Sequence, residues 1–333
     1  MGSAGWRRLG LAWAGVAGGV LLVALVLASL GPLPPRRVME AAPAPIPESQ
    51  PVAPEPAPVV AAPPPPITIA AADPALLEAG PYGPVPRIAV DGRTAMRAYA
   101  RPADARETRP RIGLVVGGLG LNAAVSEQAI TRLPPAITVA INPYSPRLGL
   151  LLDHARGRGI ETLMSLPMEP QGHPQNDAGD RALLTGLTPA ANEDRLMWVL
   201  SRFHGYVGVV GALGPLRGER FAALSEPFGT MQDNLRRRGL LYIDPRAGAR
   251  NPERAWGRTI DVVVDEPATR NDIDIRLGTL ERLARERGMA LGLAGEVTPV
   301  LLDRLLAWAE GLEGRGVVLV PVSSLIRRPE ATR

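Results

Sequence analysis

The amino-acid sequence predicts an α/β fold in which buried parallel strands alternate with helices. Short apolar runs typical of buried strands recur from Ile112 onward, with helical patterns between most of them. Two of these helices have clear start signals, because a capping threonine precedes a proline at Thr188 and again at Thr298. This alternation predicts a parallel sheet that is either open or closed into a barrel.

The predicted strands follow one another along the folded part of the chain. The last long helix is predicted from Leu301, Leu305 and Leu312, which fall on one helical face. Between Pro167 and Pro189 the chain has a long proline-rich loop, and long ordered loops are often functional. In chain order, the predicted strands are Ile112–Val116, Ile137–Ile141, Ile160–Leu166, Tyr206–Leu213, Leu240–Ile243, Thr259–Val264, Met289–Ala294 and Gly316–Val322.

An uncharged apolar stretch lies between Arg8 and Arg36. About 20 apolar residues span a bilayer, so residues 9–31 are predicted to form an uncleaved transmembrane anchor after a tail over residues 1–8. The short tail favours a single-pass protein of the inner membrane with its folded domain in the periplasm. Arginines flank both ends of the stretch, so charge leaves the opposite topology open.

Proline and alanine dominate residues 32–86, with four consecutive prolines at 63–66. Such a composition favours extended polyproline II and buries no core, whether it serves as a spacer or is low-complexity drift. We therefore expect a disordered linker over residues 32–86 and a lead-in segment over residues 87–110. A folded domain over residues 111–326 and a tail over residues 327–333 complete the predicted organisation.

The composition excludes several classes of site. The chain has no cysteine, which excludes disulfides, cysteine zinc sites and a cysteine nucleophile. The net charge of +4 comes from arginines spread along the chain, and a basic tract of the kind that binds nucleic acid is missing. We therefore expect no nucleic-acid partner.

The first predicted strand ends in Gly117–Gly120, a turn with no reactive side chain. In parallel α/β folds, catalytic groups gather at the carboxyl ends of strands. The first of these places therefore offers no chemistry.

Several segments of the chain resemble the divergent polysaccharide deacetylase family, an envelope-associated group of bacterial proteins. The most distinctive is Leu166-Pro167-Met168-Glu169-Pro170, and the resemblance extends over residues 110–326. The resemblance implies an irregular (β/α) barrel of the polysaccharide deacetylase type. The other segments that carry it are residues 183–187, 205–209, 238–246, 280–281, 308 and 320–325.

In the wider superfamily, the resemblance implies an aspartate and two histidines that hold a divalent metal ion, typically zinc. The metal polarises an acetamide carbonyl and activates water. In this chain, the positions that match the three metal-binding motifs carry Gly117 and Gly118, residues 210–212, and Leu293 and Ala294. None of these side chains coordinates a metal. We therefore expect the metal site to be lost and the protein to need no cofactor.

The remaining candidates are polar residues that follow predicted strands. Glu169, Asp244 and Asp265 are the candidate catalytic groups, and Glu169, Asp244 and Arg246 are the candidate substrate-binding groups. Each has a structural alternative. Asp244 and Arg246 would form a buried ion pair, and Glu169 would cap a backbone turn. Asp265 and its neighbour Glu266 would be a solvated pair, because adjacent strand residues point to opposite faces.

The three histidines give no clear site. His154 is predicted on a helix surface, and His204 is predicted to close a helix. His173 lies in the long loop near Asp177 and Asp180, where the loop spacing gives no converging ligand geometry. We predict no metal ligands here.

Three functions remain open. The first is a membrane-anchored, non-catalytic relative of deacetylases that binds a glycan such as peptidoglycan, or an envelope protein, through the old substrate groove. The second is an active carbohydrate deacetylase with a rearranged site. The third is a structural envelope protein that uses the barrel as an interaction surface. The replacement of all three ligand motifs favours a protein without enzymatic activity.

Overall fold

The computed structural model describes residues 67–146, 148–214 and 217–329. The predicted anchor over residues 9–31 and most of the predicted linker lie outside these ranges. Within them, no helix has the length and apolar character needed to cross a membrane.

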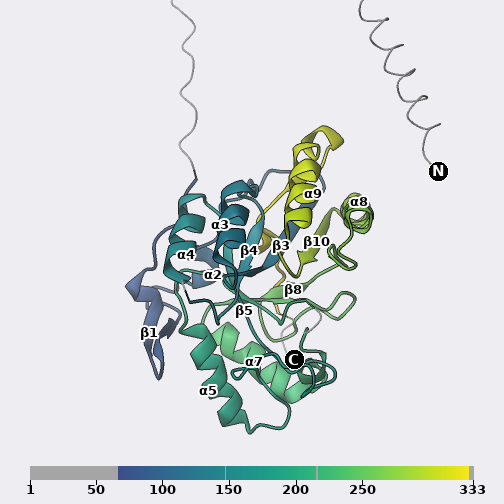
Figure 1. Cartoon of the computed structure of the whole chain (residues 1–333). Helices are drawn as coiled ribbons and strands as arrows, with labels where there is room; N and C mark the ends of the chain where they lie inside the picture. Colours follow the sequence, from purple (N-terminus) through teal and green to yellow (C-terminus); the bar gives the residue numbers. More distant parts are fainter. Residues whose placement is uncertain (1–66, 147, 215–216, 330–333) are drawn as a thin grey trace, which may run out of the picture. The chain divides into compact units, whose positions relative to one another are not determined.

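A curled sheet of parallel strands forms the centre of the domain (Figure 1). The strand β3 (Arg111–Leu119) pairs with β4 (Thr138–Ile141) on one side and with β10 (Met289–Ala294) on the other. The full strand order is β8-β7-β6-β5-β4-β3-β10-β9, and β11 pairs with the start of β3. This order confirms the predicted parallel α/β fold, in the form of a half-barrel. The remaining strands are β5 (Thr162–Ser165), β6 (Gly208–Val210), β7 (Leu241–Asp244), β8 (Gly257–Thr259), β9 (Val262–Val263) and β11 (Val318–Leu319).

The apolar runs become strands because both faces of the sheet are covered. Leu114, Val115 and Val116 of β3 point alternately to the two faces of the sheet, and none of them has exposed surface. Parallel strands buried on both faces have continuous apolar runs and not an alternating pattern. Packing is close at Gly113, where an added Cβ would lie 2.7 Å from Leu325 Cδ1.

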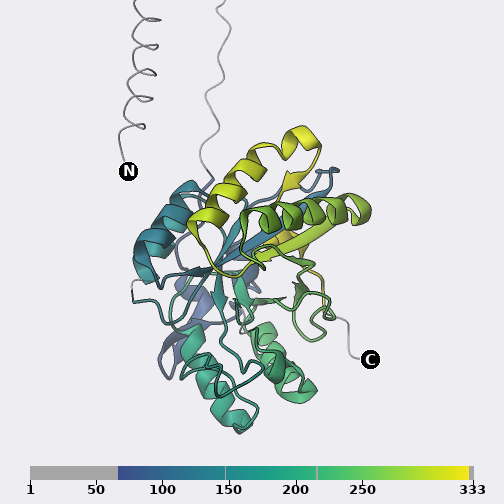
Figure 2. The same ribbon diagram turned by 45° about the vertical axis from the view of Figure 1, so that its right-hand side comes forward.

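Helices surround this sheet (Figures 1 and 2). Both predicted helix starts are confirmed, since the Thr188 hydroxyl accepts a hydrogen bond from the backbone N–H of Ala191, and Thr298 does the same for Leu301. The helices are α2 (Ala95–Ala98), α3 (Ala123–Arg132), α4 (Leu148–Gly157), α5 (Pro189–Leu200), α6 (Glu219–Ala222), α7 (Ser225–Arg237), α8 (Arg270–Arg287) and α9 (Pro299–Glu310), and the 3-10 turns are η1 (Pro74–Leu76), η2 (Glu313–Arg315) and η3 (Val322–Leu325).

The predicted strand Thr259–Val264 is wrong, because this run forms two strands at opposite edges of the sheet. β8 ends at Thr259, β9 begins at Val262, and the two do not pair. Three Cα steps keep these two residues within about 11 Å of each other, so the sheet curls until its edges face each other. Asp261 lies in the gap, where its backbone N–H donates to Leu291 O at 2.7 Å and its Oδ2 accepts from Leu291 N at 2.8 Å.

The predicted disordered linker extends too far, because residues 67–86 are folded. β1 (Leu77–Gly80) and β2 (Gly83–Pro86) form an antiparallel hairpin. Leu76 and Val85 are buried in the core, so the few apolar residues of this proline-rich stretch suffice to fix it. His204 does not close a helix as predicted. It lies beyond the end of α5, where its Nε2 is 2.9 Å from Pro84 O in the hairpin.

Candidate functional site

A groove of about 600 Å³ lies at the carboxyl ends of β3, β4, β5, β6 and β10. This is the edge of a parallel sheet at which ligands bind in most α/β proteins. The walls of the groove carry hydroxyl, amide and carboxylate groups beside small residues. Its lining includes Gly118, Asn142, Tyr144, Ser165, Ala212 and Glu296.

At the first ligand motif, Gly117 leaves no room for a larger side chain. A Cβ added to Gly117 would lie 2.3 Å from Leu213 Cδ1 and 2.9 Å from Gly295 O. Real Cβ contacts essentially never come so close, so Leu213 occupies the space that an aspartate at position 117 needs. Gly118 has a φ of 74°, a left-handed conformation that glycine adopts without strain.

The positions that match the second and third metal-binding motifs also carry small or apolar residues. At Gly211, an added Cβ would lie 2.7 Å from Pro245 Cδ and 2.8 Å from Tyr242 Oη, and Ala212 lines the groove with only a methyl group. Leu293 and Ala294 are fully buried within β10. No group of three or more His, Asp or Glu side chains is placed to hold a metal within the described ranges. The residues present therefore do not fit the metal ion of the wider superfamily.

Glu169 is held by internal partners and does not line the groove. Its side chain accepts a hydrogen bond from the backbone N–H of Thr185, and its Oε1 lies 3.0 Å from Arg220 Nε. Burial alone would raise the pKa of Glu169, but the hydrogen bonds from Thr185 and the nearby Arg220 outweigh burial and lower the pKa. The geometry is that of a carboxylate that fixes a backbone turn.

Asp244 and Arg246 form an ion pair with each other. Asp244 is 1 % exposed, and it accepts bonds from Arg246 Nε at 2.9 Å and Arg246 Nη2 at 2.7 Å. Two parallel bonds of this kind are the strongest geometry for an arginine and a carboxylate. The Arg246 guanidinium also lies 5.1 Å from the centre of the Phe228 ring. The two charges therefore pair with each other, as the interpretation of Asp244 and Arg246 as a buried ion pair predicts.

Asp265 and Glu266 do not form the solvated pair that the sequence predicts. Asp265 Oδ2 accepts from the backbone N–H of Glu296 at 3.0 Å, and Glu266 pairs with Arg217. The second carboxylate oxygen of Asp265 is buried and has no hydrogen-bond partner among the described residues. Asp265 is engaged because the chain segments that follow β9 and β10 meet here, and Glu266 is engaged by the segment that follows β6.

The groove is lined by polar residues that the sequence pattern did not single out. Ser165 Oγ is buried and has no hydrogen-bond partner within the described part of the chain. The Tyr144 hydroxyl accepts from the backbone N–H of Arg181 at 2.9 Å, and its ring lies 5.4 Å from that of Trp198. The one signal for Ser165 was a polar residue at the carboxyl end of an apolar run. The three carboxylates predicted as catalytic groups, Glu169, Asp244 and Asp265, are not among the lining residues.

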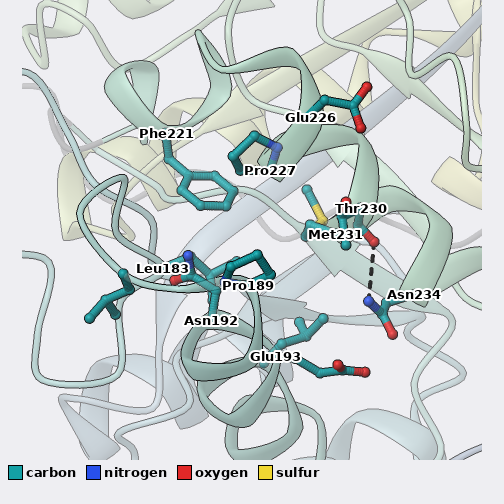
Figure 3. Close-up of a pocket in the computed structure, with 12 residues that line it drawn as sticks. Leu183, Pro189, Asn192, Glu193, Phe221, Glu226, Pro227, Thr230, Met231 and Asn234 are labelled. Atoms are coloured by element: carbon teal, nitrogen blue, oxygen red, sulfur yellow. Dashed lines mark hydrogen bonds between the residues drawn. The ribbon is translucent and has the colours of Figure 1, made fainter.

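A second cavity, of about 300 Å³, lies between α5 and α7 (Figure 3). Phe221 and Met231 contribute apolar walls, and Glu193 and Glu226 lie at its sides. The Asn234 side chain donates to Thr230 O at 3.1 Å and is thereby fixed. This cavity shares no lining residue with the groove.

The curled parallel sheet and its groove define an α/β half-barrel protein with a groove at the carboxyl ends of its strands. The chain belongs to the divergent polysaccharide deacetylase family, whose model matches residues 114–326. This membership confirms the resemblance that the sequence motifs indicated.

One solved structure agrees with this assignment, and a second is more distantly similar. An uncharacterized protein from Agrobacterium tumefaciens C58 has 32 % sequence identity, covers 73 % of this chain and 99 % of its own, and superposes with a TM-score of 0.68. The catalytic domain of a peptidoglycan N-acetylglucosamine deacetylase from Eubacterium rectale ATCC 33656 has 11 % identity over 66 % of this chain and 92 % of its own, with a TM-score of 0.43. Only the first similarity is close enough to support the fold. No curated protein matches the chain.

Proposed function

We propose that this protein is a membrane-anchored, non-catalytic member of its family that binds a cell-envelope glycan in the groove. The observation that carries the proposal is the contact between Gly117 and Leu213, because it places an apolar side chain where the family's metal-binding aspartate would stand. A protein that had kept the chemistry would keep this space for a carboxylate.

The groove itself supports a sugar ligand. Carbohydrates are recognised by hydrogen-bonding groups in a concave site, and the groove has the volume for a short oligosaccharide segment. Ser165 Oγ has no described partner, and a buried hydroxyl of this kind gains free energy when a ligand hydroxyl bonds to it. Asn142 and Tyr144 line the same groove.

The residues predicted to bind substrate have a supporting part in this proposal. Glu169 and Asp244 are engaged by Arg220 and Arg246, so we assign them to the shaping of the loops around the groove. Arg246 keeps 23 % of its side chain exposed but does not line the groove, so we assign it to the same supporting part.

The proposed location rests on the sequence alone. In this proposal, residues 9–31 cross the inner membrane once, and the folded domain lies in the periplasm. A reporter fused to the C-terminus tests this topology. Activity of a reporter that works only in the periplasm supports it, whereas activity of a cytoplasmic reporter overturns it.

One observation favours the alternative of an active deacetylase with a rearranged site. Asp265 has a buried carboxylate oxygen without a described partner. Asp265 does not line the groove, so it would serve as a general base only after the site rearranges. The same groove also suits the third alternative, an envelope protein as ligand.

Binding and turnover separate these functions. The full chain in mild detergent is titrated with N-acetylated chitooligosaccharides and peptidoglycan fragments, and acetate release is measured in the same samples. We expect binding without acetate. The variant Ser165→Ala is expected to bind about tenfold more weakly, the cost of one lost hydrogen bond. The control is Ser324→Ala, whose hydroxyl bonds to Pro321 O away from the groove. Acetate release, or equal affinity of both variants, would overturn the proposal.

A further inference from the structure

Charged side chains gather at the gap between the two edges of the sheet. Arg258 comes from β8, Asp261 from the link between β8 and β9, and Arg287 from the end of α8. Arg327 is brought in by the C-terminal segment, which pairs with the edge of β8 through two backbone hydrogen bonds to Gly257 of 2.8 and 3.0 Å. These four residues line one cavity of about 390 Å³, which we name the seam cavity.

The seam cavity has an excess of positive charge. Asp261 Oδ2 lies 2.9 Å from Arg258 Nη2, and Asp261 Oδ1 lies 3.3 Å from Arg287 Nη1. One carboxylate is therefore shared by two guanidinium groups. Arg327 adds a third guanidinium, and it forms no ion pair with any described residue. Three cations face one anion in this cavity, which leaves an excess of two positive charges.

Arg258 is the group that most needs a further partner. Only 5 % of the residue is exposed, and its Nη1 has no hydrogen-bond partner among the residues described. Burial lowers the pKa of Arg258, and the neighbouring Arg327 and Arg287 lower it further, whereas Asp261 raises it. A buried donor without an acceptor costs free energy, and an anion within reach of the guanidinium removes that cost.

We propose that the seam cavity binds a phosphate group, either carried by a phosphomonoester or free in solution. A phosphate monoester carries close to two negative charges at neutral pH, which matches the excess positive charge. Its oxygens also accept paired hydrogen bonds from arginine, and guanidinium groups are suited to such binding. The remaining polar wall includes Asn251, whose Oδ1 accepts from Thr259 N at 3.0 Å and whose amide NH₂ group is a further donor.

The rest of the ligand has room beside the phosphate. A neighbouring cavity of about 460 Å³ shares Ala249, Asn251 and Arg327 with the seam cavity. It adds two arginines and one carboxylate, from Arg250, Arg328 and Glu253. A phosphorylated sugar extending into it would meet further donors. The seam cavity shares no lining residue with the groove, so this proposal is independent of the proposed function.

Thermal unfolding of the full chain tests the proposal with two probes, inorganic phosphate and N-acetylglucosamine 1-phosphate, at low and constant ionic strength. A ligand that binds only the folded state raises Tm in proportion to the logarithm of its concentration. We expect both probes to raise Tm and acetate to leave it unchanged. A larger effect of the sugar phosphate would identify a phosphorylated sugar as the source, and equal effects would identify phosphate itself.

The variants Arg327→Gln and Arg287→Gln are expected to weaken phosphate binding by about tenfold or more, because each removes a charge-assisted contact. Arg282→Gln is the matched control, since Arg282 lies on the same helix as Arg287 but pairs with Glu286 at 2.7 Å. All three side chains are largely at the surface, so these variants are expected to fold. Equal phosphate binding by control and test variants, or an equal Tm shift in acetate, would overturn the proposal.

Discussion

Leu213 Cδ1 lies in the space that a side chain on Gly117 would need, 2.3 Å from the position of its Cβ. Gly117 lies near the end of β3 and Leu213 follows β6. A side chain at position 117 therefore requires Leu213 to move, so the two positions are coupled by packing.

This contact predicts that Gly117→Ala destabilises the protein. Overpacking of a filled core site costs about 1–3 kcal/mol. In the double variant with Leu213→Ala the cost of the added methyl group should largely disappear, which gives a coupling of about 0.5–3 kcal/mol in a double-mutant cycle. Unfolding in urea measures both.

The control for this prediction is Gly278→Ala in the middle of α8, where nothing lies within 4 Å of the added Cβ. That change should stabilise the protein by roughly 0.5–1 kcal/mol, because alanine is the better helix former. Strictly additive effects of the Gly117 and Leu213 changes would show that the two residues do not pack as described.

We predict that breaking the ion pair of Asp244 and Arg246 lowers the stability of the protein without lowering its affinity for a glycan. Asp244→Ala leaves the Arg246 guanidinium without its partner, and breaking a buried pair from one side costs about 3–5 kcal/mol. Because Arg246 is partly exposed, we expect the loss of stability in Asp244→Ala to lie near the lower end of this range, at about 3 kcal/mol. A variant with unchanged stability and weakened glycan binding would instead make the pair a ligand contact.

We predict that the buried Glu161 makes the folded protein less stable as the pH rises. It is fully buried and accepts hydrogen bonds from Thr138 and from Ser323 of η3. Burial raises its pKa, and the hydrogen bonds from Ser323 and Thr138 only partly oppose this effect. The folded state binds the proton of Glu161 more tightly than the unfolded state does. Glu161 therefore contributes its full stabilisation below the ordinary glutamate pKa, and this stabilisation is lost as the pH rises through the raised pKa of the folded state.

The variant Glu161→Gln removes this titration. Its free energy of unfolding, measured between about pH 4 and pH 8, should improve relative to the wild type as the pH rises. Parallel pH profiles of variant and wild type would show that Glu161 does not titrate differently in the folded state.

For the contribution of Glu281 to stability, we predict the opposite pH dependence. Its carboxylate accepts from Trp308 Nε1 at 2.8 Å and lies 3.0 Å from both Arg285 and Arg315. Burial would raise the pKa of Glu281, but the bonds from Arg315, Trp308 and Arg285 outweigh it and lower the pKa. The stability it contributes is therefore present above the ordinary glutamate pKa and is lost as the pH falls through the lowered one.

For Glu281→Gln, unfolding in urea at about pH 6 should show a clear loss of stability, and at about pH 3 the difference from the wild type should shrink. A difference that stays constant over this range would mean that the charge of Glu281 contributes nothing.

Much of the sheet could be predicted from the sequence, because strands buried on both faces leave continuous apolar runs. The prediction of a single strand over Thr259–Val264 was wrong for a physical reason. It is nearly continuous, and only Asp261 marks the place where the chain crosses from one edge of the sheet to the other. The fold of residues 67–86 was also hidden, because it depends on the burial of Leu76 and Val85 against distant parts of the chain.

The candidate site was harder to predict. The partner of Asp244 lies two residues away and could be anticipated, whereas the partner of Glu169 is Arg220, which only the fold brings near. Ser165 lies within an apolar run and resembles a tolerated core serine until the groove is seen. The resemblance to the family singled out Gly117, but the packing of Leu213 against this position required the structure.

We propose that the half-barrel is kept while small and apolar residues fill its metal site. The decisive experiment measures the metal content of the full chain together with acetate release from N-acetylated chitooligosaccharides. We predict far less than one zinc ion per chain after purification in zinc-containing buffer, and no acetate release that a chelator abolishes. One tightly bound metal ion per chain, with turnover that a chelator removes, would contradict it.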